Sequence, residues 1–307
     1  MTAHLIHIGY AKTGTTLLKA WFEAHPEIAY APNGLAGFGS VHDVSRQCAD
    51  PGFKALLRVT SSEALATPGP CASRTPDCQS VGRHIPHSRA EVVCAELASL
   101  FPSAQVLLVT RGFRSVMASG YSQYVATGGT DGFFGAWPRF GADEDGRHAW
   151  DYDRIIGQYR AAFGERLIVL PYELLRDDPE RFTGMIGARF GLSPFPLPTR
   201  RFNASLSGVE LRWYPRIGRL IRLLPVGGRA RRGLLALYAR LVQRNLLRPL
   251  VAFLQWAHPL EPVGPAMVVR EVIDRFRGRA DCLRNDPLYA PYAADYLLED
   301  AGCPRAE

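Results

Sequence analysis

Lysine is almost absent from this chain: Lys12, Lys19 and Lys54 are the only three among 36 lysines and arginines. A coding bias explains most of this preference for arginine. It still makes Lys12 conspicuous, because that residue lies between two glycines in a loop near the start of the sequence. Acidic residues are missing from one long stretch, from Leu211 to Leu260, which contains ten arginines. These shortages mark the loop and the arginine-rich stretch as unusual parts of the chain.

Long apolar runs are missing as well. No run of eighteen apolar residues is free of charge, so the sequence predicts no membrane-spanning helix. We expect no secretory leader and a cytoplasmic protein, since no basic segment followed by an apolar segment and a cleavage site is present. The cysteines lack metal-type spacing. Reduced thiols are favoured over a disulfide framework, although Cys71 and Cys78 flank a polar loop where they can pair.

The chain contains enough apolar residues for a large core. Of 307 residues, 47% are hydrophobic, which favours one large α/β domain with or without a helical extension. Strand-like apolar runs alternate with helical patterns, which predicts a parallel sheet with helices on both faces. We expect a first strand and a first helix on either side of the loop, further strands at 53–60, 106–110 and 166–171, and further helices at 88–100, 114–126, 151–163 and 179–190.

The loop after the first strand nearly spells a nucleotide-binding P-loop. Gly9 and Gly14 have the P-loop spacing, and Thr16 holds the Ser/Thr position. The position of the P-loop lysine is taken by Thr15, and the only lysine of the loop, Lys12, lies inside it. A strand, a tight loop and a helix N-terminus point backbone N–H groups at an anion. The sequence therefore predicts phosphate binding by a loop that differs from those of ordinary kinases and ATPases.

This loop resembles that of the sulfotransferases that use 3′-phosphoadenosine 5′-phosphosulfate (PAPS), whose first loop reads roughly P-K-[ST]-G-T-T. A second similarity is Arg111 directly after an apolar strand, with Ser119 eight positions later. A third is a strand that ends in the pair Tyr172 and Glu173. The resemblance covers residues 4–205 and implies a three-layer P-loop-type α/β fold. It implies PAPS binding by Ala11, Lys12, Thr13, Gly14, Thr15, Thr16, Arg111, Ser119 and Tyr172.

The residue types fit the chemistry of sulfuryl transfer, which depends on positioning and on charge stabilisation. The Lys12 ammonium suits the oxygen that becomes the leaving group. The planar guanidinium of Arg111 suits a phosphate with three free oxygens, and Ser119 lies two helical turns further along. The mechanism needs no metal. The resemblance implies that Tyr172 lies near the adenine. The sequence differs from the family in two places: Leu17 replaces the aromatic residue that stacks on the adenine, and the C-terminal Arg-Lys-Gly loop is missing.

Three residues are candidates for the general base that takes the proton of the acceptor. The family uses a His or a Glu after the second strand, and this sequence has Glu63 there. Glu63 can equally cap the following helix or pair with an arginine. His84 and His87 are the alternatives.

In such sheets, ligands bind at the carboxyl ends of the strands. We therefore expect Lys12, Glu63, Arg111 and Tyr172 to lie close together at one edge, because each follows a strand. The expected domain organisation is a PAPS-binding core at 1–205 and an arginine-rich helical part at 206–307.

The stretch from Leu211 to Leu260 predicts two basic amphipathic helices, separated at Pro225 to Gly228. Such helices can lie on an anionic membrane, and they can also pack on the core or on a second copy of the chain. Nucleic-acid binding is disfavoured, because the stretch is rich in leucine and lacks aromatic residues at stacking intervals.

The sequence thus predicts a cytoplasmic PAPS-dependent sulfotransferase, peripheral to a membrane if the basic helices bind one. The predicted acceptor is a hydroxyl of a glycan, a lipid or a natural product. The aromatic residues of segment 130–150 indicate an apolar one: Phe133, Phe134, Trp137, Phe140 and Trp150. The alternatives are a P-loop small-molecule kinase, which requires a lysine after Gly14, and a non-catalytic binding module at a membrane surface.

Overall fold

The computed structural model describes residues 2–10, 12–30, 55–62, 65, 90–133, 150–199, 205–263 and 275–299. The chain divides into two compact units. The first unit consists of Met1–Gly112, Ala142–Phe202 and Phe276–Glu307, and the second of Phe113–Gly141 and Asn203–Arg275. Each unit draws on both sides of residue 205, so the expected division into 1–205 and 206–307 stays a prediction.

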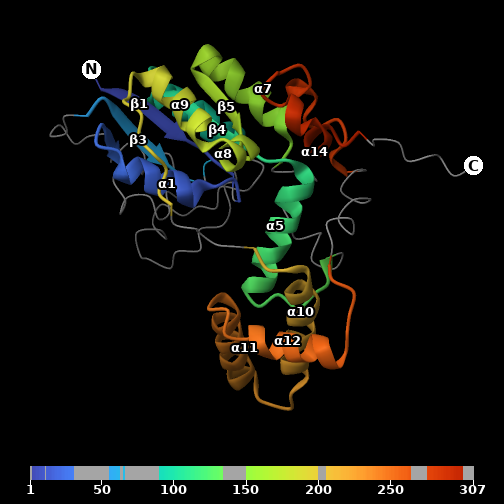
Figure 1. Ribbon diagram of the computed structural model, residues 1–307. Helices are drawn as coiled ribbons and strands as arrows, with labels where there is room; N and C mark the ends of the chain where they lie inside the picture. Colours follow the sequence, from blue (N-terminus) through green and yellow to red (C-terminus); the bar gives the residue numbers. More distant parts are fainter. Residues whose placement is uncertain are drawn as a thin grey trace, which may run out of the picture. The chain divides into compact units, whose positions relative to one another are not determined.

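The first unit is built on a five-stranded parallel sheet with the strand order β2-β3-β1-β4-β5 (Figure 1). Strand β4 contains the continuous apolar run Val106 to Val109, as expected for a strand that is covered on both faces. Leu5 pairs with Val59, and Val109 pairs with Leu170. The strands are β1 Ala3–His7, β2 Ile28–Tyr30, β3 Leu57–Ser61, β4 Gln105–Thr110 and β5 Leu167–Pro171.

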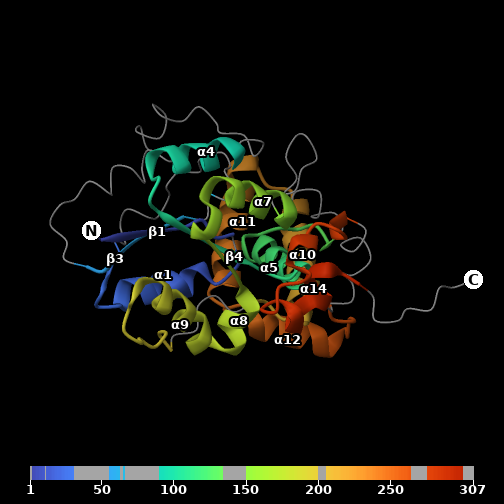
Figure 2. The same ribbon diagram turned by 90° about the horizontal axis from the view of Figure 1, so that it is seen from above.

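Helices cover both faces of this sheet, which confirms the predicted three-layer α/β fold (Figure 2). Helices α1 Thr15–Ala24, α8 Tyr172–Asp177 and α9 Pro179–Phe190 lie on one face, and α4 Ala90–Leu100 and α7 Tyr152–Phe163 on the other. The core on the α1 face includes Leu18, Trp21, Phe22, Phe182 and Ile186. The C-terminal part of this unit contains the short elements η7 Asp281–Leu283, η8 Ala290–Tyr292 and α14 Ala293–Leu297, and η5 Gly164–Arg166 precedes β5.

Local sequence signals set most of these boundaries. The Asp151 side chain accepts a hydrogen bond from Arg154 N at the start of α7, and Asp178 accepts one from Arg181 N at the start of α9. Strand β2 was not predicted, because three residues are too few to show a strand pattern. Residues 53 and 54 of the strand predicted at 53–60 lie outside the described residues, and the strand itself begins at Leu57.

The second unit is helical. It contains α5 Phe113–Ala126, α10 Gly208–Leu223, α11 Gly228–Gln243 and α12 Arg248–Ala257. The predicted break at Pro225 to Gly228 is confirmed, but the prediction of only two helices after Leu211 was wrong. A second break occurs because Asn245 adopts a left-handed backbone with φ +58° and Pro249 stands in the first turn of α12. Among the described residues, no helix is long and apolar enough to cross a membrane.

Candidate functional site

The loop between β1 and α1 requires glycine at positions 9 and 14 for two different structural reasons. A Cβ at Gly9 would lie 2.4 Å from His7 Nε2, so a larger residue there would collide with a buried ring. The His7 ring donates to or accepts from Ser61 Oγ at 2.8 Å, and burial lowers the pKa of His7 to about 3, with a smaller effect from Lys19. Gly14 has a left-handed backbone at φ +77°, the region that glycine tolerates best.

The loop is held in shape by its own threonines. The hydroxyls of Thr13 and Thr15 both donate to the backbone oxygen of Tyr10, at 2.6 and 3.2 Å. Both side chains are buried, whereas Thr16 is exposed at the start of α1. The hydroxyls of Thr13 and Thr15 therefore stabilise the loop, and Thr16 is the threonine whose side chain faces solvent.

The N-terminus of α1 has the properties of an anion site. Gly14 is its N-cap without a side-chain hydrogen bond, and the first turn contains no acidic residue. The first helical bond runs from Leu18 N to Gly14 O, so the N–H groups before Leu18 have no helical acceptor. The positive end of the helix dipole adds to this preference for negative charge. Ala11 lies outside the described residues.

Arg111 lies directly after β4 and contacts the loop. Its Nη1 donates to the backbone oxygen of Lys12 at 2.5 Å, and its guanidinium carbon lies 4.4 Å from the centre of the Tyr172 ring. Burial lowers the pKa of Arg111, and Tyr172 and Glu173 partly oppose that shift. The structure thus brings together the Lys12 backbone, Arg111 and Tyr172, three of the four positions expected to lie close together.

Tyr172 also supports the loop from the side of α8. A Cβ at Gly14 would lie 3.1 Å from two carbons of the Tyr172 ring and 2.7 Å from Leu175 Cδ2. The ring therefore packs against the loop glycine as well as under the Arg111 guanidinium. This packing gives Tyr172 a positioning function, whatever its contact with an adenine.

A buried carboxylate anchors the turn after Arg111. Glu173 Oε1 accepts a hydrogen bond from Gly112 N at 3.0 Å, and Glu173 Oε2 accepts one from the Tyr296 hydroxyl at 2.8 Å. The hydroxyls of Tyr289 and Tyr296 also lie 2.8 and 3.1 Å from Thr110 Oγ1. The C-terminal part of the first unit therefore holds the end of β4 in place.

Tyr152 supports Arg111 through its backbone. The Tyr152 hydroxyl donates to Arg111 O at 2.6 Å and accepts from Arg111 N at 3.1 Å. Tyr152, Tyr289 and Tyr296 were not predicted from the sequence, and Glu173 had no predicted function beyond the Tyr-Glu resemblance. Their spacing carries no motif, because each reaches the site from a distant part of the chain.

Other predicted site residues stay predictions. Glu63, His84 and His87 lie outside the described residues, so the general base stays open. Ser119 is buried in α5 and belongs to the second unit, so its pairing with Arg111 stays a prediction.

Within the parts of the chain that the structure describes, no cluster of His, Cys, Asp and Glu could hold a metal ion, and Cys94 and Cys282 are free thiols. Cys71 and Cys78 lie outside the described residues.

Comparison with solved structures confirms the fold. A sulfotransferase from Alicyclobacillus acidocaldarius is 17% identical with a TM-score of 0.50, and the alignment covers 76% of this chain and 99% of that chain. A mouse sulfotransferase, SULT7A1, complexed with PAP, is 13% identical with a TM-score of 0.38, covering 70% of this chain and 63% of that chain. That second similarity is too low to carry an argument. No protein-family model and no curated protein matches the sequence.

Proposed function

We propose that this chain belongs to the PAPS-dependent sulfotransferases and transfers a sulfuryl group from PAPS to a hydroxyl of an acceptor. The observation that carries the proposal is the meeting of the loop and Arg111 at the carboxyl edge of the sheet. Arg111 Nη1 lies 2.5 Å from Lys12 O, next to a helix N-terminus without an acidic residue. The fold shared with the Alicyclobacillus acidocaldarius sulfotransferase supports this proposal.

The loop fits the phosphosulfate end of the donor. When bound, PAPS would supply an activated sulfuryl group. The backbone N–H groups at the start of α1 would hold the 5′-phosphate, and the exposed Thr16 hydroxyl would donate to the same anion. The Lys12 ammonium would stabilise the negative charge that develops on the leaving oxygen. Binding of the donor in this way would require no movement of the loop, because the hydroxyls of Thr13 and Thr15 already fix its shape.

Arg111 fits the 3′-phosphate. A guanidinium offers two parallel donors to a phosphate, which gives both charge and orientation. Tyr152 holds its backbone and Tyr172 lies under its guanidinium, so the donors are ordered before the phosphate arrives. Such preorganisation lowers the entropic cost of binding. Ser119 remains the proposed second donor to this phosphate.

The acceptor hydroxyl requires a group that takes its proton. Glu63 is the proposed general base, with His84 and His87 as alternatives. The proposed acceptors are a glycan, a lipid or a natural product. The kinase alternative is disfavoured by Thr15, since a P-loop kinase has a lysine at that position.

Calorimetric titration with adenosine 3′,5′-bisphosphate, the desulfated product, tests the proposal without magnesium. We expect binding to the wild type and an affinity lower by about tenfold to a hundredfold in Arg111→Ala, the range for a lost charged hydrogen bond. Arg181→Ala, an exposed arginine of α9, is the matched control and should bind like the wild type.

Activity completes the test. With labelled PAPS and a panel of hydroxyl acceptors, Lys12→Ala should lower kcat by about a hundredfold or more, while Lys19→Ala stays close to the wild type. Binding of ATP with magnesium in place of the bisphosphate would overturn the proposal in favour of a kinase. Bisphosphate binding without sulfuryl transfer to any acceptor would favour the non-catalytic module.

A further inference from the structure

The three helices after residue 207 carry an unusual excess of positive charge. The stretch from Leu211 to Leu260 has ten arginines and no acidic residue, whereas the whole chain has a net charge of +7. Subtracting these ten charges leaves the rest of the chain at −3. The positive charge of the protein is therefore concentrated on α10, α11 and α12.

Almost none of this charge is neutralised. Among the described residues, Arg248 is the one arginine of this stretch that pairs with a carboxylate, that of Glu210. Four others donate to backbone oxygens instead: Arg212 to Glu261, Arg216 to Arg212, Arg219 to Thr130, and Arg231 to Leu224 and Val226. Hydrogen bonds of this kind orient the guanidinium and leave its charge uncompensated.

The same helices expose large apolar side chains. Leu250, Phe253 and Trp256 recur every third residue of α12, and 43%, 59% and 80% of their surface is exposed. The rings of Phe253 and Trp256 lie 6.1 Å apart, so they form one apolar cluster. Further exposed residues are Leu220 and Leu223 at the end of α10, Leu224 directly after it, Leu234 and Leu237 on α11, and Leu246 before α12. We call these apolar residues and the ten arginines the basic apolar surface.

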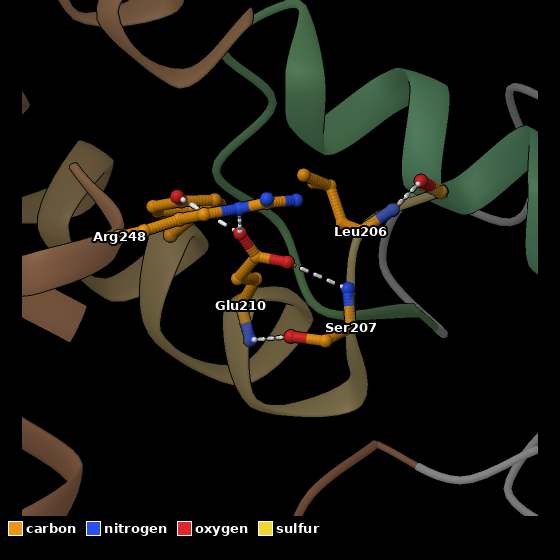
Figure 3. A network of polar contacts seen from close by, with 6 residues as sticks. Leu206, Ser207, Glu210 and Arg248 are labelled. Carbon is orange, nitrogen blue, oxygen red and sulfur yellow. Dashed lines mark hydrogen bonds and ion pairs between the residues drawn. The ribbon is translucent and has the colours of Figure 1, made fainter. Parts of the chain in front are cut away.

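The helices that carry the basic apolar surface are fixed to one another. Figure 3 shows Glu210, which accepts from Ser207 N at 2.7 Å at the start of α10 and from Arg248 Nε at 2.9 Å at the start of α12. Trp213 Nε1 donates to Gln255 Oε1 at 2.8 Å, and the Tyr238 hydroxyl of α11 donates to Tyr214 O at 2.6 Å. The surface is therefore preformed within the second unit.

The chemistry of the surface selects its partner. Many exposed leucines and aromatic residues on neighbouring helices indicate a docking site. A second copy would present the same positive charge and be repelled. A nucleic acid would satisfy the arginines but leave the leucines in contact with water. An anionic bilayer satisfies both, because its headgroups carry phosphate and its acyl region accepts apolar side chains.

We propose that the basic apolar surface docks the protein on an anionic phospholipid bilayer, with Phe253 and Trp256 as its deepest residues. The arginines then contact lipid phosphates around this apolar cluster. The inference is independent of the proposed transferase activity, since it rests on the second unit alone.

Co-sedimentation with vesicles tests the inference on the full chain. We expect binding to vesicles of phosphatidylcholine with phosphatidylglycerol, and binding at least about tenfold weaker to phosphatidylcholine alone. Phe253→Ser/Trp256→Ser should lower the affinity by about tenfold or more, since two exposed aromatic rings would no longer be transferred from water into the bilayer. Met185→Ser/Leu100→Ser, two exposed apolar residues of the first unit, is the matched control and should bind like the wild type.

Two double variants that each remove two positive charges measure the electrostatic contribution to vesicle binding. Arg222→Gln/Arg244→Gln should weaken anionic vesicle binding by about tenfold or more, while Arg160→Gln/Arg181→Gln of the first unit should have little effect. All four substituted arginines are exposed, so the variants should fold, which circular dichroism checks. A blue shift of tryptophan fluorescence on anionic vesicles that disappears in Trp256→Phe would place this residue in the bilayer.

Three results would overturn the inference. Equal binding to both kinds of vesicle would show that the arginines make no electrostatic contribution to binding. Binding of the Phe253→Ser/Trp256→Ser variant as tightly as the wild type would show that the apolar cluster makes no contribution. A dimer by light scattering that becomes a monomer in that variant, without vesicle binding, would assign the surface to a second copy.

Discussion

At the scale of single residues, the candidate site contains several side chains that hold Arg111 and its neighbouring loop in position. Tyr152 holds the Arg111 backbone, Tyr172 lies under its guanidinium, and Glu173 anchors the next residue. Each contact restricts the freedom of a group that would bind phosphate. Substitutions at these positions should therefore affect both stability and affinity.

Replacing Gly14 should damage the loop through backbone and packing together. In Gly14→Ala the backbone stays at φ +77° and the new Cβ meets Leu175 Cδ2 at 2.7 Å, so we expect a loss of about 2 kcal/mol or more in stability. Chemical denaturation measures this loss. Gly184→Ala is the control, because that glycine lies in α9 with open space around it, and it should be neutral or slightly stabilising. Equal stability of the two variants would contradict the packing argument.

Removing one hydroxyl should test the carboxylate anchor. Tyr296→Phe leaves Glu173 Oε2 without its Tyr296 donor and removes the hydroxyl oxygen that lies 3.1 Å from Thr110 Oγ1, which should cost about 1–3 kcal/mol in stability and weaken bisphosphate binding. Tyr292→Phe is the matched control, since the Tyr292 hydroxyl makes no hydrogen bond to the described residues, and it should change stability by less than about 0.5 kcal/mol. Thermal unfolding and titration measure the two effects. A Tyr296→Phe protein as stable as the control would show that the anchor is dispensable.

At the scale of elements, the start of α10 combines a helix cap with an ion pair. The Ser207 hydroxyl accepts from Glu210 N, and the Glu210 carboxylate accepts from Ser207 N in return, a capping box that also reaches Arg248. Burial raises the pKa of Glu210, but the hydrogen bonds from Ser207 and Arg248 outweigh it and hold the pKa below its ordinary value of 4.5.

This shift predicts how stability depends on pH. A carboxyl group with a lowered pKa in the folded state stabilises the protein above the unfolded pKa, and the contribution disappears as the pH falls through the folded value. We expect Glu210→Gln to be less stable than the wild type by about 1–2 kcal/mol near neutral pH. As the pH falls below 4.5, the stability of the variant should decrease less than that of the wild type, because the variant has no carboxylate to protonate. Urea unfolding at several pH values measures this. Glu261→Gln, on an exposed residue, should follow the wild type, and parallel pH curves for all three proteins would refute the prediction.

At the scale of the whole molecule, the chain has two compact units, each with its own buried residues. The loop between β1 and α1, Arg111 and Tyr172 all belong to the first, and the basic apolar surface belongs to the second. A ligand of the loop and a substitution in α10 should therefore act on different units.

Calorimetry should resolve these units as two transitions, because separate cores do not have to unfold together. A hundredfold excess of adenosine 3′,5′-bisphosphate over its dissociation constant should raise one transition by several degrees, equivalent to about 2.7 kcal/mol. Glu210→Gln should lower the other transition. A single transition that responds equally to both changes would show that the units unfold as one.

The predictions that succeeded rest on signals within a few residues. The loop between β1 and α1, the helices predicted at 151–163 and 179–190, and the break at Pro225 to Gly228 depend on neighbouring residues, so they are visible in the sequence. Strand β2 was missed because it is short and pairs with β3, a contact that no local pattern records. The second break before α12 was missed because it needs the left-handed backbone of Asn245, which that residue type permits without requiring.

The glycine spacing of the loop between β1 and α1, the alternation of strands and helices, and the concentration of arginine after residue 211 are properties of the sequence itself, since spacing and composition suffice to identify them. Only the tertiary structure decided which side chains surround Arg111. Tyr152 reaches it across 41 positions, and Tyr296 reaches Glu173 across 123. Such contacts depend on how the layers pack on the sheet, because a hydrogen bond is made where two atoms meet in space, whatever their separation along the chain.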